Sequence, residues 1–223
     1  MPPSGPSVLC IDDDRDIAEI VQAALDDEGY AVSCLYSAHG DLVARTVGQL
    51  EPDCVLLDSV SSSGYDEAWI DVASLGTRSR RVPVVMFTAH AMDAKEARTG
   101  TSDRALAANF VAVLDKPFHL DELLAAVGKA TGQSAPFDRS AGAERVRTRA
   151  LVEALHARGA TDIEPSMRRE WATFRDKDGE LCQMYWWQGR GVYQLGRYTD
   201  AGKLRMIGQF TDRDATIDIA LPR

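Results

Sequence analysis

Four short apolar runs in the N-terminal part of this 223-residue chain each lead into side chains that can do chemistry. Asp12 and Asp13 follow the first run, Asp58 closes the second, Thr88 closes the third and Lys116 follows the fourth. Buried parallel strands place their carboxyl ends at one edge of a sheet, which is where open α/β sheets bind their ligands. Carboxylates, a hydroxyl and an ammonium gathered at one edge suit a divalent cation and a phosphoryl group. The residue types therefore predict metal-assisted phosphoryl chemistry.

The elements that must position these side chains alternate between strand and helix. The first stretch between apolar runs places Ile17, Ile20 and Leu25 on one helical face, ahead of Gly29 as a stop signal. Such alternation predicts right-handed β-α-β crossovers and a parallel sheet that is covered on both faces. We expect a flavodoxin-like (βα)5 doubly wound sheet with strands at residues 8–11, 30–35, 54–57, 82–87 and 111–114.

Each of these signals taken alone also has an ordinary structural interpretation. Acidic residues near a helix start accept orphan N–H bonds and complement the helix dipole, and we expect Asp14 and Asp16 to do this. An Asp in a strand-to-loop turn is common, and a Lys before Pro117 is usually a solvated charge ahead of a helix. The occurrence of all the signals, in order and at successive strand ends, favours one common site.

The order and spacing of Asp-Asp, Asp, Thr-Ala and Lys-Pro-Phe resembles the receiver domain of two-component response regulators, over residues 1–133. The resemblance implies that Mg²⁺ is bound by the carboxylates of Asp12, Asp13 and Asp58 and by the backbone carbonyl of Val60. It also implies that Asp58 accepts a phosphoryl group from a histidine kinase or a phosphotransfer protein. A carboxylate attacks an anionic phosphoryl group poorly unless charge is neutralised, so this covalent step requires the cation.

The resemblance assigns roles to the remaining site residues as well. It implies that Lys116 reaches the phosphoryl oxygens as a point charge and that the Lys116–Pro117 bond is cis. Thr88 and the backbone N–H of Ala89 would hydrogen-bond the same oxygens. A receiver catalyses only its own phosphorylation and dephosphorylation, so we expect a regulatory phosphoprotein that carries an aspartyl phosphate, not an enzyme.

The sequence departs from the receiver pattern at three places. The loop after Asp58 reads Ser-Val-Ser-Ser-Ser-Gly and lacks the usual Pro. The position three residues before the Lys, where receivers commonly carry a switch aromatic, is Val113. The stretch from Thr88 to Lys116 is longer than usual and contains Gly100-Thr101-Ser102, which predicts a broken or displaced fourth helix. Signal transmission is therefore expected to differ in detail.

Charge and composition change along the chain. Residues 1–136 hold 10 Lys and Arg against 21 Asp and Glu, whereas residues 137–223 hold 15 against 13, so the net charges are −11 and +2. The Gly, Ser and Pro content around residues 134–140 predicts a linker before an effector or interaction domain at residues 141–223. No signal peptide or membrane-spanning run is visible, which predicts a cytoplasmic protein without a membrane partner. The four cysteines are expected to be buried thiols, not disulfide partners or zinc ligands.

The C-terminal segment predicts a small α+β domain. Helical spacing at residues 143–158 is followed by paired strand signals around two Gly-containing turns. We expect one helix and then an antiparallel meander of about five strands, at residues 171–174, 181–187, 192–198, 204–210 and 216–221. No family resemblance is visible in this segment.

The output of this segment has two leading interpretations. Trp186 and Trp187 are consecutive in a strand, so one of them faces away from the single expected helix and is the best candidate for a protein interface or a homodimer. The alternative is a DNA-binding transcriptional regulator, suggested by Arg145, Arg147 and Arg149. A net charge of +2 and the lack of a helix pair argue against a helix-turn-helix, so a downstream protein partner is preferred. An enzymatic output is the least favoured.

Overall fold

The computed structural model describes residues 5–37, 40–58, 81–133, 141–166, 170–187, 190–200 and 202–222, without the side chains of residues 40 and 141–146. The chain divides into two compact units. The first comprises Met1–Phe118 and Glu122–Pro136, and the second comprises His119–Asp121 and Phe137–Arg223. The expected linker at residues 134–140 lies outside the described residues, and the division into domains 1–133 and 141–223 stays a prediction.

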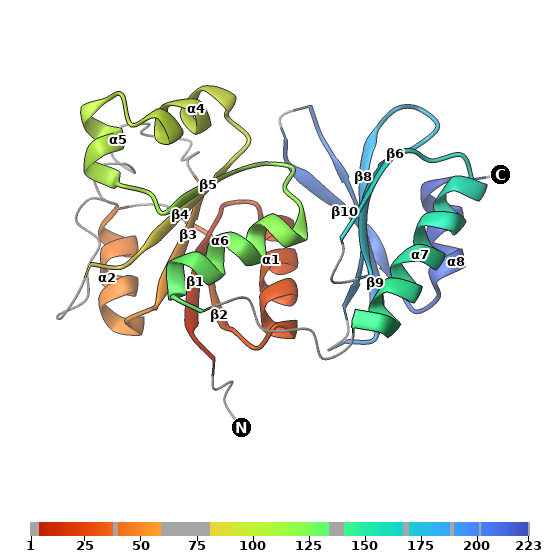
Figure 1. Ribbon diagram of the computed structural model, residues 1–223, viewed down its shortest axis with the longest axis horizontal. Coiled ribbons are helices and arrows are strands. Elements are labelled where there is room, and N and C mark those ends of the chain that lie inside the picture. The colour runs from red at the N-terminus through yellow and green to blue at the C-terminus, as the bar shows by residue number, and fades with distance from the viewer. Residues whose placement is uncertain are drawn as a thin grey trace. The chain divides into compact units, whose positions relative to one another are not determined.

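The first unit contains a five-stranded parallel sheet in the order β2-β1-β3-β4-β5 (Figure 1). This is the strand order of flavodoxin-like doubly wound folds, as expected from the sequence. Every residue of the interior strands β3 and β4 is buried, because helices cover both faces of the sheet. The strands are β1 (Ser7–Ile11), β2 (Ala31–Leu35), β3 (Cys54–Asp58), β4 (Val84–Thr88) and β5 (Ala112–Asp115).

The helices of the first unit lie on the two faces of this sheet. One face packs against α2 and α5 through a core that includes Leu9, Val55 and Met86 from the strands and Val47 and Ala105 from the helices. Figure 1 shows α1 and α6 on the other face. The described helices are α1 (Arg15–Asp27), α2 (Gly40–Leu50), α4 (Ala91–Thr99), α5 (Asp103–Ala108) and α6 (Leu120–Thr131).

The predicted break in the fourth helix is present. α4 ends at Gly100, which adopts the left-handed conformation with φ of 59° and donates its N–H to the Glu96 carbonyl. Ser102 then caps α5 by accepting the N–H of Ala105. A Gly stop followed by a Ser cap therefore replaces one long helix with two short ones.

The second unit is an antiparallel meander in the order β10-β9-β8-β7-β6 with helices before and after it. The five-strand meander was expected, and four of its strands lie where the sequence placed them. The elements are α7 (Ala141–Ala157), β6 (Thr161–Pro165), β7 (Trp171–Arg175), β8 (Leu181–Trp187), β9 (Val192–Tyr198), β10 (Leu204–Phe210) and α8 (Arg213–Ala220).

Two expectations for the second unit were wrong: the last strand at residues 216–221 and the presence of one helix only. Residues 216–221, predicted as the last strand, belong mostly to helix α8, because the Asp212 side chain accepts the N–H of Ala215 and caps it. Its buried residues Thr216, Ile217 and Ala220 follow helical spacing. The fifth strand is instead β6, a polar edge strand with no buried residue, which gave no apolar signal.

The two faces of the second sheet have different partners. Leu155 of α7 and Ile217 of α8 pack against one face, in a core with Phe174 and Met184. Trp186 lies on this helix-covered face. Trp187, its neighbour in β8, therefore faces away from the helices; it is 8% exposed, and the Arg190 guanidinium lies 3.8 Å from the centroid of its ring. Among the described residues, no helix is long and apolar enough to cross a membrane.

Candidate functional site

The acidic residues Asp12, Asp13 and Asp14, which follow β1, have two roles: some contribute to the site and one caps the next helix. Asp14 caps α1 by accepting the N–H groups of Asp16 and Ile17, at 3.1 and 3.4 Å, as the sequence predicts. Asp12 is buried, and its Oδ1 accepts the N–H of Asp14 at 2.9 Å. Asp13 is exposed between them. The backbone turn that starts α1 thereby places two carboxylates at the carboxyl end of β1.

Lys116 holds two buried carboxylates together. Its Nζ lies 2.7 Å from Asp12 Oδ2 and 3.1 Å from Asp58 Oδ2, and its side chain is 4% exposed. Burial alone would lower the pKa of Lys116, but the negative charges of Asp58 and Asp12 outweigh burial and raise it. The ammonium also lies 4.5 Å from the centroid of the Phe87 ring. Lys116 is therefore a fixed positive charge at the centre of the site.

The carboxyl groups of Asp12, Asp13 and Asp58 outnumber the one ammonium that faces them, that of Lys116. Burial raises the pKa of the Asp12 carboxyl to about 7, although Lys116 acts in the opposite direction. One oxygen from each of Asp12, Asp13 and Asp58 lies within 4.8 Å of the others. Three carboxylates facing one ammonium form a donor set that fits Mg²⁺, which prefers oxygen ligands and retains water. Receiver domains bind Mg²⁺ at such a cluster, and Asp12, Asp13 and Asp58 would hold it.

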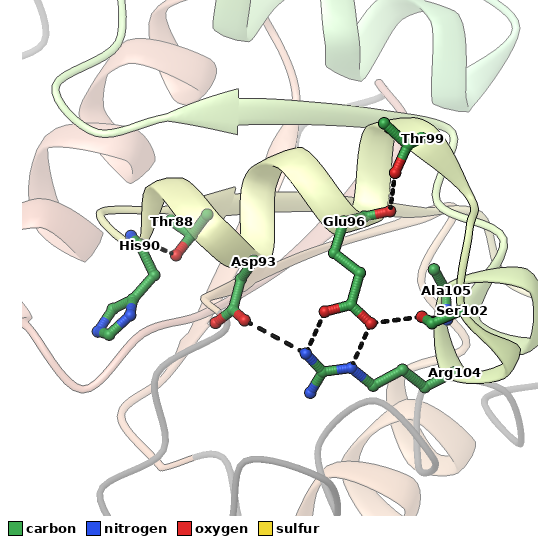
Figure 2. Close-up of polar contacts among 8 residues, drawn as sticks. All are labelled: Thr88, His90, Asp93, Glu96, Thr99, Ser102, Arg104 and Ala105. Carbon is green, nitrogen blue, oxygen red and sulfur yellow. Dashed lines mark hydrogen bonds and ion pairs between the residues drawn. The ribbon is translucent and has the colours of Figure 1, made fainter.

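Thr88 ends β4 at the same edge of the sheet. It is 1% exposed, and its Oγ1 accepts the N–H of His90 at 2.9 Å (Figure 2). Its carbonyl accepts the N–H of Lys116 at 2.7 Å, so the ends of β4 and β5 are joined beside the site. Ala89 is half-buried between β4 and α4. The Lys116–Pro117 peptide bond is cis, as the resemblance implies.

The structure brings together Asp12, Asp13, Asp58 and Lys116 and places Thr88 on the adjoining strand end. Val60, the expected backbone ligand, lies outside the described residues, as does the Ser-rich loop that follows Asp58. The roles of the individual residues stay predictions, whereas their common location at the carboxyl ends of β1, β3, β4 and β5 is a finding.

Sequence reasoning missed a charged network that joins α4 to α5. Arg104 of α5 reaches back to α4, where its Nε lies 2.8 Å from Glu96 Oε1 and its Nη2 lies 3.5 Å from Asp93 Oδ1 (Figure 2). Ser102 also donates to Glu96. These hydrogen bonds lower the pKa of Glu96 to about 2. The only sequence signal was two acids three residues apart on one helix and an Arg beyond the break.

A second Arg connects α4 to β5 near Val113. The Arg98 Nη2 lies 3.2 Å from the Val113 carbonyl oxygen and 2.6 Å from Asp115 Oδ2. Val113 itself is partly buried against the core formed with α2 and α5. The strand that leads to Lys116 is therefore tied to α4 by an Arg rather than through a switch aromatic at position 113.

Comparisons with known proteins find receiver domains that are similar to this chain. The sequence model of the family described as "Response regulator receiver domain" matches residues 8–128. A response regulator receiver protein from Burkholderia phymatum is 30% identical, with a TM-score of 0.47, over 59% of this chain and 99% of that one. The receiver domain of NtrX from Brucella abortus is 23% identical, with a TM-score of 0.46, over 57% and 99%.

The family match begins at Val8, the second residue of β1, and includes the other four strands and every strand end that carries a site residue. It covers more than half of the 223 residues. The sheet order, the carboxylate cluster and the buried Lys thus agree with the sequence match, and the chain belongs to the response regulator receiver domain family.

Proposed function

We propose that Asp58 is the phospho-acceptor of a phosphorelay and that a histidine kinase or a phosphotransfer protein supplies the phosphoryl group. An oxygen of Asp58 attacks phosphorus, the new O–P bond forms, and the N–P bond of the phosphohistidine donor breaks. When bound, Mg²⁺ supplies the positive charge that this encounter of two anions needs. The observation that carries the proposal is the position of Lys116, whose ammonium contacts both Asp12 and Asp58 at the edge where three carboxylates meet.

The other site residues act on the product of this step. Lys116 contacts two carboxylates in the structure described here, and its ammonium is close enough to Asp58 to contact a phosphoryl group on that side chain. The Thr88 hydroxyl and the Ala89 N–H would donate to the remaining oxygens. Phosphorylation adds up to about two negative charges and three acceptor oxygens, which draw these donors inward.

This acid–ammonium site is tested by removing one carboxylate charge at a time. We expect wild-type protein to gain one phosphoryl group from a histidine kinase or from acetyl phosphate in the presence of Mg²⁺, and Asp58→Asn to gain none, by intact mass. Asp53→Asn is the matched control, because Asp53 precedes the same strand and bonds the backbone N–H and hydroxyl of Ser7 instead. Full labelling of Asp58→Asn would reject the assignment.

We further propose that phosphorylation switches the second unit, which binds a downstream protein partner or forms a homodimer. A net charge of +2 over residues 137–223 gives little attraction for DNA, and the whole meander separates α7 from α8 in sequence, unlike the consecutive helices of a helix-turn-helix. DNA binding by another type of surface is the alternative. We expect both outputs to operate in the cytoplasm.

The route of the signal is proposed to run through α4 and α5. Arg104 ties these two helices to each other, and Arg98 ties α4 to the strand that precedes Lys116. Hydrogen exchange with and without beryllofluoride, a phosphoryl mimic, should change most between residues 89 and 109. Unchanged exchange outside the Asp58 loop would reject this route.

A gel shift at controlled salt and a mass measurement in solution would then separate DNA binding from dimerisation.

A further inference from the structure

Two cysteines lie directly opposite each other in the parallel sheet. Cys10 of β1 and Cys34 of β2 are register partners, so their side chains project to the same face. Neighbouring strands are about 4.8 Å apart, and disulfides join Cα atoms about 4.4 to 6.8 Å apart. The two thiols also affect each other's pKa: the neighbouring thiol raises the pKa of Cys10 and lowers that of Cys34. Local sequence patterns do not reveal this pair, because 23 residues and a helix separate its members.

The two thiols differ in access and in acidity. Cys10 is fully buried, whereas Cys34 is partly exposed beside α1, where its Sγ lies 3.7 Å from the Ala18 carbonyl oxygen and 3.9 Å from Gln22 Oε1. The neighbouring Cys10 thiol lowers the pKa of Cys34. A more acidic and more accessible thiol is the one that an oxidant meets first.

We propose that Cys10 and Cys34 are a redox site of this protein and that hydrogen peroxide converts them to a reversible disulfide. In the first step the Cys34 thiolate attacks one peroxide oxygen, the O–O bond breaks, and the released hydroxide takes up a proton to form water. In the second step the Cys10 sulfur attacks the sulfenic acid on Cys34. The S–S bond forms, the S–O bond breaks, and hydroxide leaves with the Cys10 proton as a second water. Two thiols lose two electrons, and one peroxide gains them.

The disulfide would act on the phosphoryl site at short range. Cys10 is two residues from Asp12, and the residue after Cys34, Leu35, accepts the N–H of Asp12 at 3.1 Å. Closing the disulfide brings the two sulfur atoms to about 2 Å, so both side chains must reorient beside the strand ends that position Asp12. A misplacement of about 1 Å in a catalytic site costs up to about 100-fold in rate. We therefore expect slower phosphorylation of Asp58, a consequence that rests on the function proposed above.

The disulfide itself is tested without any phosphorylation. We expect full-length protein treated with hydrogen peroxide to lose two hydrogen atoms by intact mass and to yield a peptide pair linked through Cys10 and Cys34. Cys34→Ser should abolish this change. Cys54→Ser is the matched control, because Cys54 lies opposite Val8 of β1 and should leave the cross-link unaffected. A product with added oxygen and no cross-link, or a cross-link between two chains, would overturn the proposal even if a variant failed to fold.

The effect on the phosphoryl site is measured separately. The initial rate of phosphorylation by acetyl phosphate should fall at least about tenfold on oxidation and recover with dithiothreitol, whereas Cys34→Ser should keep its rate in peroxide. An intramolecular disulfide with an unchanged rate would overturn the coupling to Asp58. If reduced wild-type protein took up no phosphoryl group, the proposed function would fail, and the mass experiment would still decide the redox site.

Discussion

The two sheets of this chain use their buried polar side chains in opposite ways. In the parallel sheet, Asp12, Asp58 and Thr88 come from three different strand ends and meet at one edge. In the antiparallel sheet, the buried carboxylate of Asp176 is satisfied locally. It accepts the N–H groups of Asp178 and Glu180 in its own turn and the Arg197 guanidinium at 2.8 Å. The first arrangement concentrates charge for a ligand, and the second stabilises a turn.

This difference follows from topology. Parallel strands all end at the same edge of a sheet, so residues distant in sequence are collected there. An antiparallel meander sends successive strand ends to alternate edges, so its polar residues find partners in the nearest turn or in the next strand. Tyr198 of β9 and Gln183 of β8 form such a cross-strand pair, with the Tyr198 hydroxyl 2.5 Å from Gln183 Oε1. Chemistry is therefore expected in the first sheet and recognition in the second.

The comparison is tested most strongly by cavities in the two cores. Leu56 of β3 and Phe174 of β7 are both fully buried, and truncation of such residues to Ala costs about 3–5 kcal/mol. We expect Leu56→Ala to destabilise the first unit and Phe174→Ala the second. Hydrogen exchange in denaturant, followed by mass spectrometry, resolves the two sheets. Equal loss of protection in both sheets for either variant would contradict the division into two units.

A second test removes the cation from each buried carboxylate. Lys116→Met leaves Asp12 and Asp58 without their ammonium and should cost about 3 kcal/mol in the absence of Mg²⁺. Arg197→Met should cost about 1 kcal/mol, because Asp176 keeps two backbone donors and Arg197 is partly exposed.

Urea denaturation measures both losses. Added Mg²⁺ should restore part of the stability of Lys116→Met and none of that of Arg197→Met. Equal losses, or rescue of both variants by Mg²⁺, would erase the distinction between a ligand site and a structural ion pair.

Lys116→Ala is also expected to accept the phosphoryl group without normal activation, because the lost ammonium contacts the phosphoryl group rather than the metal.

The pH dependence of Mg²⁺ binding follows from Asp12. Burial raises its pKa from 3.8 to about 7, so the metal-free folded protein holds a proton there that the unfolded chain has lost. Between about pH 4 and pH 7 the folded state binds more protons, so stability falls as the pH rises through this window. Mg²⁺ must displace the same proton, and its affinity should rise up to about tenfold per pH unit towards pH 7 and level off above it.

Calorimetric titration at several pH values, in two buffers, measures this released proton. Asp12→Asn should weaken Mg²⁺ binding and remove the pH dependence. A wild-type affinity that is flat between pH 5 and pH 7 would show that Asp12 is ionised throughout, and the buried carboxyl would then not set the metal affinity.

The smallest expected effect concerns the ion pairs by which Arg104 of α5 joins Asp93 and Glu96 of α4. Arg104→Met should cost about 1 kcal/mol and speed hydrogen exchange in these two helices, because Arg104 is three-quarters buried and holds Glu96 and Asp93. Arg149→Met is the matched control. Arg149 pairs with Glu153 on the exposed side of α7, where such a pair adds little. Similar changes for both variants would mean that the α4–α5 network is an ordinary surface ion pair.

The sequence alone determined the parallel sheet, the broken fourth helix and the residues that meet at the sheet edge. Continuous apolar runs identify strands that are buried on both faces, and alternation of strands with helices indicates a parallel sheet. The sequence therefore predicted that Asp12, Asp58, Thr88 and Lys116 meet at one edge of that sheet. Four strands of the second sheet were also predicted, because their turns carry Gly.

Only the tertiary structure decided the features that depend on register and on packing between distant segments. The β1–β2 register sets Cys10 opposite Cys34, and the close approach of α5 to α4 brings Arg104 to Glu96. The segment predicted as a last strand became α8 because the Asp212 cap and burial against α7 and β9 outweighed its local strand propensity. Pairing of distant residues is a property of the whole fold, and local sequence patterns do not encode it.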